Sequence, residues 1–535
     1  MTRMDPVSVL AVGRNGAALT RFREVLPIFS NDPRIHVRYA AAPGSPHADG
    51  NSRLLAELGA KTIAWSDALR ERHLLALATS ANGGLHKLRA PVLLLPHGAG
   101  RHKLAGAHPY GLNPAQLTRR GRVIPAAIGI SHADQLEILS RSCPAAVERA
   151  VPVGDPCHDR LVAAAHLRPR LRRGLGLAPD RELVLISSTW GAGSLFETRR
   201  DLPERLLAAL PADQYAVALV LHPNIWSEYG RDQIVGRWYE RAVRAGLMIV
   251  PWEEGWQAAL LSADHVVGDH GSVTYYAAAL GKPVLLAAFS TDVLVPGTAL
   301  TRFAEQAPRL EPRGDLTAQL VAAAQDAVAR HAASVDLAFS APGRSLEAMR
   351  DVAYRLMELD PPASVPDPPS VPVPECRVES PTAYRVFVDV DSKEPNGPGR
   401  LVARVERIAA VLETEGLATA RTHHVAADLE HPQLRHLHRA GVVFARGHHA
   451  TSMDQNAVFR DYPGARVFAG IHGEVCRVAL AEGPRATAVV RDADPALAAS
   501  LVYARLSGVL PGATFDPAEI EIGDRRVLIE FTDLP

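Results

Sequence analysis

Short apolar runs alternate with helix-like patterns along the first 290 residues, and this alternation constrains the fold more than any other feature of the chain. Runs such as VSVLAVG (7–13) and PVLLLPHG (91–98) are typical of buried strands. The series restarts at ELVLISSTW (182–190) and continues to PVLLAAF (283–289). Strands that alternate with helices in this way form βαβ units around a mainly parallel sheet. The sequence therefore predicts two successive Rossmann-like α/β lobes that face each other across a crevice at the strand ends.

A proline-rich segment separates these lobes from the rest of the chain. Residues 360–383 carry so many prolines that neither a helix nor a strand can persist, so we expect a semi-rigid extended linker. The sequence thus predicts a first lobe at 1–165, a second lobe at 166–359 and a C-terminal α/β or α+β accessory domain at 384–535. In that last domain, LVARVERIAAVLETEG (401–416) has the spacing of a helix.

Charge and composition narrow the range of partners. Lys plus Arg and Asp plus Glu both number 58, so no net field favours nucleic acid or an anionic membrane. The apolar run near the N-terminus is too short for a secretion signal or a membrane span, and we expect a cytoplasmic protein with no integral membrane segment. The four cysteines form no CxxC pair, and no cluster of His, Cys or carboxylate residues has metal-site spacing. We therefore expect neither a bound metal nor a nucleic-acid partner.

The most informative segment is ADHVVGDHGSVTYYAAALGKPV (263–284). A strand pattern there runs directly into a loop and then into a helix pattern that a Gly-Lys-Pro sequence ends. Such a loop directs backbone N–H groups, the Ser272 and Thr274 hydroxyls and the positive end of a helix at one spot, which suits a phosphate. An ordinary strand-to-helix turn with Ser272 as the N-cap fits the same spacing. The residues predicted to bind the donor phosphates here are Asp269, His270, Gly271, Ser272 and Thr274.

This segment resembles part of the CDP-glycerol glycerophosphotransferases of teichoic acid synthesis, in which a strand, an acidic residue and two serines precede a helix and a Lys-Pro-Val strand. UDP-sugar 2-epimerases and other GT-B enzymes carry a looser version. The resemblance implies a GT-B-like fold, in which two Rossmann-like lobes enclose a cleft and the first lobe usually binds the acceptor. Four further motifs resemble those of the family: LLLPHGAGRHK (93–103), VPVGDPCHDRL (151–161), ISSTWGAG (186–193) and LVLHPN (219–224).

The resemblance also implies roles for five residues in these motifs. His97, at the end of an apolar strand, would act as the general base, since the pKa of histidine suits removal of a proton from an attacking hydroxyl. His222 would stabilise the pyrophosphate or protonate the leaving group. Thr189 and Trp190 follow the first strand of the second lobe, where a nucleotide base or diphosphate docks in this fold, and Lys103 would complement phosphate charge. Core packing of Trp190 and a solvated turn at Lys103 are the structural alternatives.

These motifs predict a transferase that moves a glycosyl or glycerophosphoryl group from a nucleotide-activated donor to a hydroxyl acceptor. The donor is a substrate, and we expect no separate cofactor. Two alternatives stay open. A UDP-sugar 2-epimerase needs acidic residues near the sugar ring, for which Asp155, Glu253, Glu254 and Asp269 are the candidates. A catalytically silent GT-B scaffold, which the altered DHGS motif permits, would act through protein contacts of the C-terminal domain.

Histidines are frequent in the C-terminal domain, but their spacing is not that of a metal site. No two of those in HPQLRHLHRA (431–440) stand three or four residues apart, and no HExxH order occurs. We expect solvated surface histidines on a domain that binds a protein partner, forms a homo-oligomer or regulates the lobes. The seven residues are His423, His424, His431, His436, His438, His448 and His449.

Overall fold

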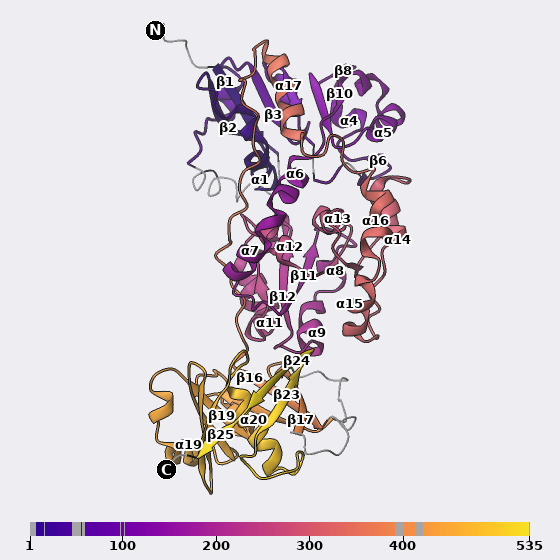
Figure 1. The fold of residues 1–535 in the computed structure, drawn as a ribbon. Helices are drawn as coiled ribbons and strands as arrows, with labels where there is room; N and C mark the ends of the chain where they lie inside the picture. The colour runs from indigo at the N-terminus through magenta and orange to yellow at the C-terminus, as the bar shows by residue number, and fades with distance from the viewer. Residues whose placement is uncertain are drawn as a thin grey trace.

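Three main sheets, one beyond another, organise the chain (Figure 1). The first lobe lies at one end of the molecule, the second lobe in the middle and the C-terminal domain at the other end. The second lobe therefore contacts both of its neighbours. The computed structural model describes residues 7–14, 16–44, 55, 59–96, 98–100, 102–390, 401–412 and 421–533.

The first lobe is built on a six-stranded sheet in which the strand pairs are parallel. Apolar clusters cover both faces of this sheet, which explains why its strands read as almost continuous apolar runs. In spatial order the strands are β10 (Ala150–Pro152), β9 (Ala127–Ile130), β4 (Val92–Leu94), β3 (Leu75–Ala78), β1 (Val7–Gly13) and β2 (Ile35–Ala41). The helices are α1 (Gly16–Val25), α3 (Trp65–Ala68), α4 (Pro114–Leu117), α5 (Gln135–Ser142) and α6 (Pro156–Ala164). Two short hairpins join β5 (Leu104–Ala105) to β6 (His108–Pro109) and β7 (Thr118–Arg119) to β8 (Arg122–Val123).

The second lobe repeats this plan with a five-stranded parallel sheet. The predicted α/β fold class, with two successive Rossmann-like lobes, is confirmed. In spatial order the strands are β13 (Met248–Ile249), β12 (Tyr215–Leu221), β11 (Glu182–Ser188), β14 (His265–Gly268) and β15 (Val284–Leu286). The helices are α7 (Arg168–Gly174), α8 (Leu195–Thr198), α9 (Leu202–Ala209), α10 (Pro223–Gln233), α11 (Glu240–Arg244), α12 (Trp256–Ser262), α13 (Ser272–Ala279), α14 (Ala299–Gln306), α15 (Leu316–Ala324) and α16 (Ala327–Val335).

The last helix before the linker, α17 (Ser345–Met357), returns to the first lobe. It lies within the range that the sequence assigns to the second lobe. Its apolar face joins the cluster around Val9 and Phe22, and the Tyr354 hydroxyl donates a hydrogen bond to Asp32 Oδ2 (2.8 Å). The chain therefore crosses between the lobes a second time.

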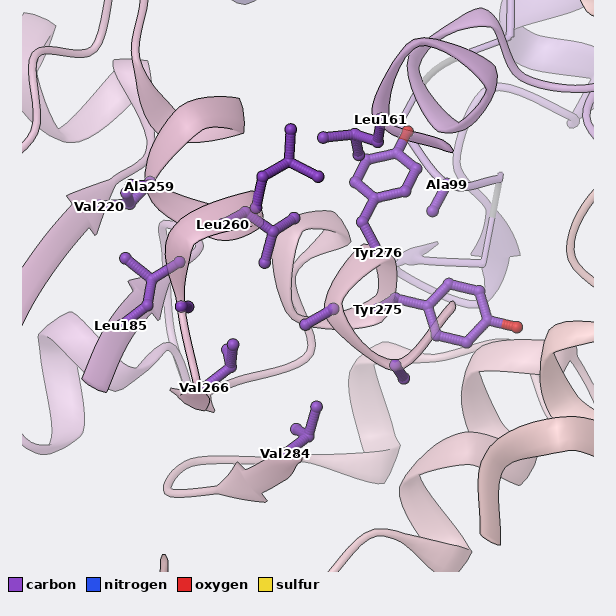
Figure 2. Packing of buried hydrophobic residues seen from close by; sticks show 14 of the residues in the cluster. Ala99, Leu161, Leu185, Val220, Ala259, Leu260, Val266, Tyr275, Tyr276 and Val284 are labelled. Carbon is purple, nitrogen blue, oxygen red and sulfur yellow. The ribbon is translucent and has the colours of Figure 1, made fainter. Parts of the chain in front are cut away.

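A buried contact joins the two lobes. Figure 2 shows Ala99 and Leu161 beside the rings of Tyr275 and Tyr276 on α13, and all four residues belong to one apolar cluster. Beside this cluster, the Asp155 carboxylate accepts hydrogen bonds from Arg21 Nη2 on α1 (2.7 Å) and from the Tyr276 hydroxyl (2.6 Å). Because Asp155, Arg21 and Tyr276 are all buried, this network ties α1 and α6 of the first lobe to α13 of the second.

The linker follows an extended path along the side of the second lobe, as Figure 1 shows. Residues 358–382 contain neither helix nor strand, which is what the density of prolines predicts. Arg160 Nε donates to the carbonyl of Pro369 (3.0 Å), and the Val378 N–H donates to the carbonyl of Leu175 (2.9 Å). Backbone groups of the linker are therefore held by the body of the protein at intervals.

The C-terminal domain contains a ten-stranded mixed sheet. The helix predicted at 401–416 is wrong, because residues Leu401–Ala409 form strand β17, which pairs with β16 on one side and β23 on the other. Pairing along both edges overrides the local helical spacing. In spatial order the strands are β24 (Arg525–Ile529), β23 (Ala518–Ile522), β17, β16 (Ala383–Val390), β18 (His423–Asp428), β19 (Val442–Arg446), β20 (Val467–His472), β21 (Val475–Leu480), β22 (Arg485–Val489) and β25 (Phe531–Asp533). The helices are α18 (Leu434–Arg439), α19 (Gln455–Asp461) and α20 (Ala496–Leu506).

The C-terminal domain docks on the end of the second lobe that faces away from the first lobe. Buried Arg407 on β17 forms ion pairs with Asp213, which precedes β12, and with Asp494 of its own domain (Nη1–Oδ2 2.7 Å). The Ala212 N–H also donates to the carbonyl of Arg407 (2.8 Å). Because Asp213 stands at the amino end of β12, the docked domain lies far from the carboxyl ends of the second sheet.

Three of the seven histidines expected at the surface of this domain are buried, so that expectation is wrong for His424, His431 and His436. The His431 and His436 rings are joined by an Nε2–Nδ1 hydrogen bond of 2.8 Å, and Thr382 Oγ1 lies 2.7 Å from His431 Nδ1. The turn between β18 and α18 folds the two rings together although they are five residues apart. The remaining four are exposed: His423, His438, His448 and His449.

Within the described residues, no helix combines the length and the apolar character that crossing a membrane requires. The same residues place no three His, Cys, Asp or Glu side chains where they would share a metal ion.

Candidate functional site

The carboxyl ends of three neighbouring strands of the second sheet bring the predicted site residues together. Thr189 and Trp190 follow β11, His222 follows β12 and Asp269 follows β14. In a parallel sheet these ends share one edge, and here that edge faces the first lobe. The structure therefore gathers residues that lie up to 80 positions apart in the sequence.

Asp269 holds the loops of this edge in place. Its carboxylate is fully buried and accepts hydrogen bonds from the backbone N–H groups of Thr189 (2.9 Å), Leu195 (2.9 Å) and Gly271 (2.9 Å). Burial raises the pKa of Asp269, while the Leu195 N–H and the Lys103 ammonium oppose that rise. In this conformation Asp269 therefore caps the loops that follow β11 and β14.

The start of α13 lies beneath a turn of the first lobe. Gly271 is the N-cap, so Ser272 is the first helical residue rather than the cap. The Ser272 hydroxyl accepts a hydrogen bond from the Ala99 N–H (3.3 Å), and a Cβ atom on Gly98 would lie only 2.3 Å from Ser272 Oγ. Thr274 is fully buried in the core of the lobe. A ligand that bound the N–H groups of α13 would have to displace the 98–100 turn.

Lys103 crosses from the first lobe to the strand ends of the second. Its ammonium donates to Thr189 Oγ1 (2.9 Å), and the Val295 N–H secures the approach by donating to the carbonyl of His102 (2.8 Å). Burial lowers the pKa of Lys103, and the nearby Asp269 carboxylate opposes that change. Among the residues that the structure describes, Lys103 forms no ion pair. A half-buried cation with one neutral partner can accept an anionic ligand.

Trp190 and His222 form the open side of the candidate site. The Trp190 side chain is 43% exposed, and its ring centroid lies 6.0 Å from that of His222. Because its side chain is this exposed, Trp190 is not packed in the core. His222 Nδ1 accepts a hydrogen bond from the Asn224 N–H (3.1 Å), so the neutral ring carries its proton on Nε2. In that tautomer, Nε2 is a hydrogen-bond donor.

His270 is buried behind this edge. Its side chain packs edge-on against Phe289, with ring centroids 6.1 Å apart, and only 3% of the residue is exposed. Burial lowers the pKa of His270 to about 4, and the charge of Lys103 acts in the same direction. The imidazole is therefore neutral at pH 7, and in this conformation it supports the loop without reaching solvent.

The predicted general base, His97, lies outside the described residues. The sequence analysis missed the lobe interface formed by Arg21 and Tyr276 with Asp155. No local signal marks these three as partners, since Arg21 and Asp155 are 134 residues apart.

No protein-family model matches the chain, and no curated protein matches it. Solved structures match about two thirds of it. The wall teichoic acid polymerase TagF matches with a TM-score of 0.45 and 15% identity, over 66% of this chain and 89% of that one. A UDP-GlcNAc 2-epimerase from Neisseria meningitidis, bound to UDP-GlcNAc, matches with a TM-score of 0.40 and 13% identity, over 66% of this chain and 100% of that one. S. aureus MnaA, in a structure with UDP, matches with a TM-score of 0.41 and 12% identity, over 68% of this chain and 99% of that one. A likeness at this level of identity concerns the fold alone.

Proposed function

We propose that the chain is a transferase that moves a glycosyl or glycerophosphoryl group from a nucleotide-activated donor to a hydroxyl acceptor. The observation that carries the proposal is the half-buried Lys103 ammonium at the strand ends of the second lobe, which has a neutral hydroxyl partner and no ion pair among the described residues. Thr189, which accepts the hydrogen bond from Lys103, is followed in the chain by Trp190, whose exposed ring lies near that of His222. A cation, an aromatic surface and an N–H donor at one edge suit the diphosphate and the ring of a nucleotide donor.

The chemistry follows from the charges that develop during transfer. As the bond to the leaving diphosphate breaks, negative charge accumulates on its oxygens, where the Lys103 ammonium and the His222 Nε2–H would stabilise it. The N-terminus of α13 would contribute further N–H groups once the 98–100 turn moves aside. His97, as the predicted base, would take the proton from the attacking hydroxyl.

Three of the four carboxylates considered for a 2-epimerase are engaged elsewhere, which favours transfer over epimerisation. Asp155 is bonded to Arg21 and Tyr276 at the lobe interface, and Asp269 is saturated by backbone N–H groups. Glu254 forms an ion pair with Arg23 (3.1 Å). An epimerase needs an acid or base free to reach the sugar ring, and these three groups are committed to structure.

Donor binding tests the proposal directly. CDP-glycerol, UDP-sugars and GDP-sugars are added singly to the full chain, and the melting temperature is measured. We expect at least one donor to raise it, and we expect Lys103→Met to remove the increase because the diphosphate loses its cation. Lys87→Met, a change to an exposed lysine of the first lobe, is the matched control and should retain the increase.

Two results would contradict the assignment. If no member of a broad nucleotide-donor panel raises the melting temperature of the wild-type protein, the donor site is wrong. If a UDP-N-acetyl sugar is interconverted with its epimer in the absence of any acceptor, the protein is an epimerase. Release of nucleotide that depends on an added hydroxyl acceptor is the result expected of a transferase.

A further inference from the structure

A cavity of about 350 Å³ opens at the carboxyl end of β15, beside the candidate site. This volume falls in the range of small-molecule sites, about 300 to 1,000 Å³. Residues 287–289, which continue from β15, line it together with Thr198 and Arg199 at the end of α8. Arg309 and Leu310 line it from a segment that runs parallel to β15, where the Leu310 N–H donates to the carbonyl of Leu286 (3.0 Å). The cavity is thus built on ordered backbone.

The cavity adjoins the candidate donor site through two shared elements. Phe289 lines the cavity and also packs edge-on against His270. Gly193 lines it from the loop that begins at Thr189 and Trp190, and a Cβ atom on Gly193 would lie 3.5 Å from Ser290 Cβ. A substrate held at Trp190 therefore has this cavity next to it.

Two arginines, Arg199 and Arg309, give the cavity its charge. Arg309 is held over the Phe289 ring, with its guanidinium carbon 4.7 Å from the ring centroid, and its Nη2 donates to the carbonyl of Ala304 (3.1 Å). The stacking fixes the plane of the guanidinium, and its other N–H groups have no acceptor within the part of the chain that the structure describes.

Among the described residues, no carboxylate pairs with the two arginines of the cavity. Neither arginine forms an ion pair with any described carboxylate, although exposed Glu197 and Glu311 stand nearby in the sequence. Two cations that line one cavity repel each other, and an anion between them removes that repulsion. The planar guanidinium fork matches the oxygens of a carboxylate or a phosphate.

We propose that this cavity is an anion subsite, in which Arg199 and Arg309 bind a carboxylate or phosphate group of the substrate. The inference rests on the proposed function, since it assumes that the substrate occupies the adjoining edge. It narrows the substrate class to one that carries a negative charge besides the donor diphosphate, either on the transferred group or on the acceptor. Phe289 and the backbone of residues 287–288 would pack against the uncharged part of that group.

The subsite is tested with citrate, a tricarboxylate that contains no nucleotide. Citrate binding to the full chain is measured by calorimetry for the wild type, for the double variant Arg199→Gln with Arg309→Gln, and for the control Arg302→Gln with Arg313→Gln. The control removes two exposed arginines of the same lobe that do not line the cavity. We expect the cavity variant to weaken binding about tenfold or more and the control to leave it unchanged. Wild-type protein that does not bind citrate, or a cavity variant that binds it equally well, would overturn the proposal.

Paired ligands then locate the charge on the substrate. A preference for UDP-glucuronate over UDP-glucose that disappears in the cavity variant assigns the anion to the transferred group. A preference for glycerol 3-phosphate over glycerol that disappears in the same way assigns it to the acceptor. If neither pair shows an arginine-dependent preference, the role in substrate binding is refuted. If no nucleotide binds while citrate binding still depends on the two arginines, the proposed transferase function fails and the anion site stands.

Discussion

Removal of the Asp155 charge is expected to loosen the junction between the lobes. Asp155 has no exposed side-chain surface and accepts hydrogen bonds from Arg21 Nη2 (2.7 Å), the Tyr276 hydroxyl (2.6 Å) and the Cys157 N–H (2.9 Å). In Asp155→Asn, the buried Arg21 guanidinium keeps Glu24 as its one ionic partner among the described residues. Breaking a buried ion pair from one side costs about 3 to 5 kcal/mol, because the remaining charge is left in a poorly solvated site.

This cost converts into a measurable shift of the melting temperature. The two lobes together span residues 7–357. Their unfolding entropy is therefore about 0.7 kcal/mol/K, at about 2 cal/mol/K per residue. A loss of about 3 to 5 kcal/mol lowers the melting temperature of the lobes by about 4 to 7 °C. Differential scanning calorimetry of the full chain measures that transition.

A surface pair in the same lobe provides the comparison. Asp67 pairs with Arg70 (3.1 Å), and both side chains are largely open to solvent. Asp67→Asn makes the same chemical change as Asp155→Asn and should leave the melting temperature nearly unchanged. If the two variants melt at the same temperature, the network around Asp155 does not hold the lobes together and the reasoning is refuted.

Two other predictions concern the C-terminal domain and the buried histidines. Arg407→Met should detach the C-terminal domain and speed proteolysis of the linker, because Asp213 and Asp494 lose their shared cation. Donor binding should not change in this variant. Equal rates of linker proteolysis in wild type and variant would count against this docking. Burial lowers the pKa of His270 and of His331 to about 4, from a usual 6.5. The unfolded chain binds these protons first, so the free energy of unfolding should fall as the pH drops from 6.5 to 4, by at most about 1.4 kcal/mol per pH unit for each histidine. Melting temperatures across this range check the slope, and an unchanged slope in His331→Leu would contradict it.

Much of the architecture of the lobes was predictable because it depends on local patterns. The run at 182–190 is apolar enough to be covered on both faces, and it forms the buried strand β11. Residues that follow parallel strands meet at one edge, and Thr189, His222 and Asp269 follow three neighbouring strands of the second sheet. The proline density of the linker excludes regular structure whatever surrounds it.

Three predictions were wrong because contacts between residues distant in the sequence outweighed the local sequence pattern. Residues 401–409 have helical spacing but pair with strands on both sides. Ser272 fits the pattern of an N-cap, but it is the first helical residue and its hydroxyl accepts a hydrogen bond from Ala99. His431 and His436 were expected at the surface, but the fold of the C-terminal domain buries them and brings their rings into hydrogen-bond contact.

The amino-acid sequence by itself determined two parallel α/β lobes, an extended linker and the edge of strand ends where a substrate would bind, because apolar periodicity and proline act over a few residues. Only the tertiary structure decided that the 98–100 turn covers α13, since the Ala99–Ser272 contact joins positions 173 residues apart. The same holds for Arg199 and Arg309, which neither motif nor spacing connects and which line one cavity because β15 and α8 bring them there. Burial and charge pairing are properties of neighbours in space, and the chain acquires those neighbours only when it folds.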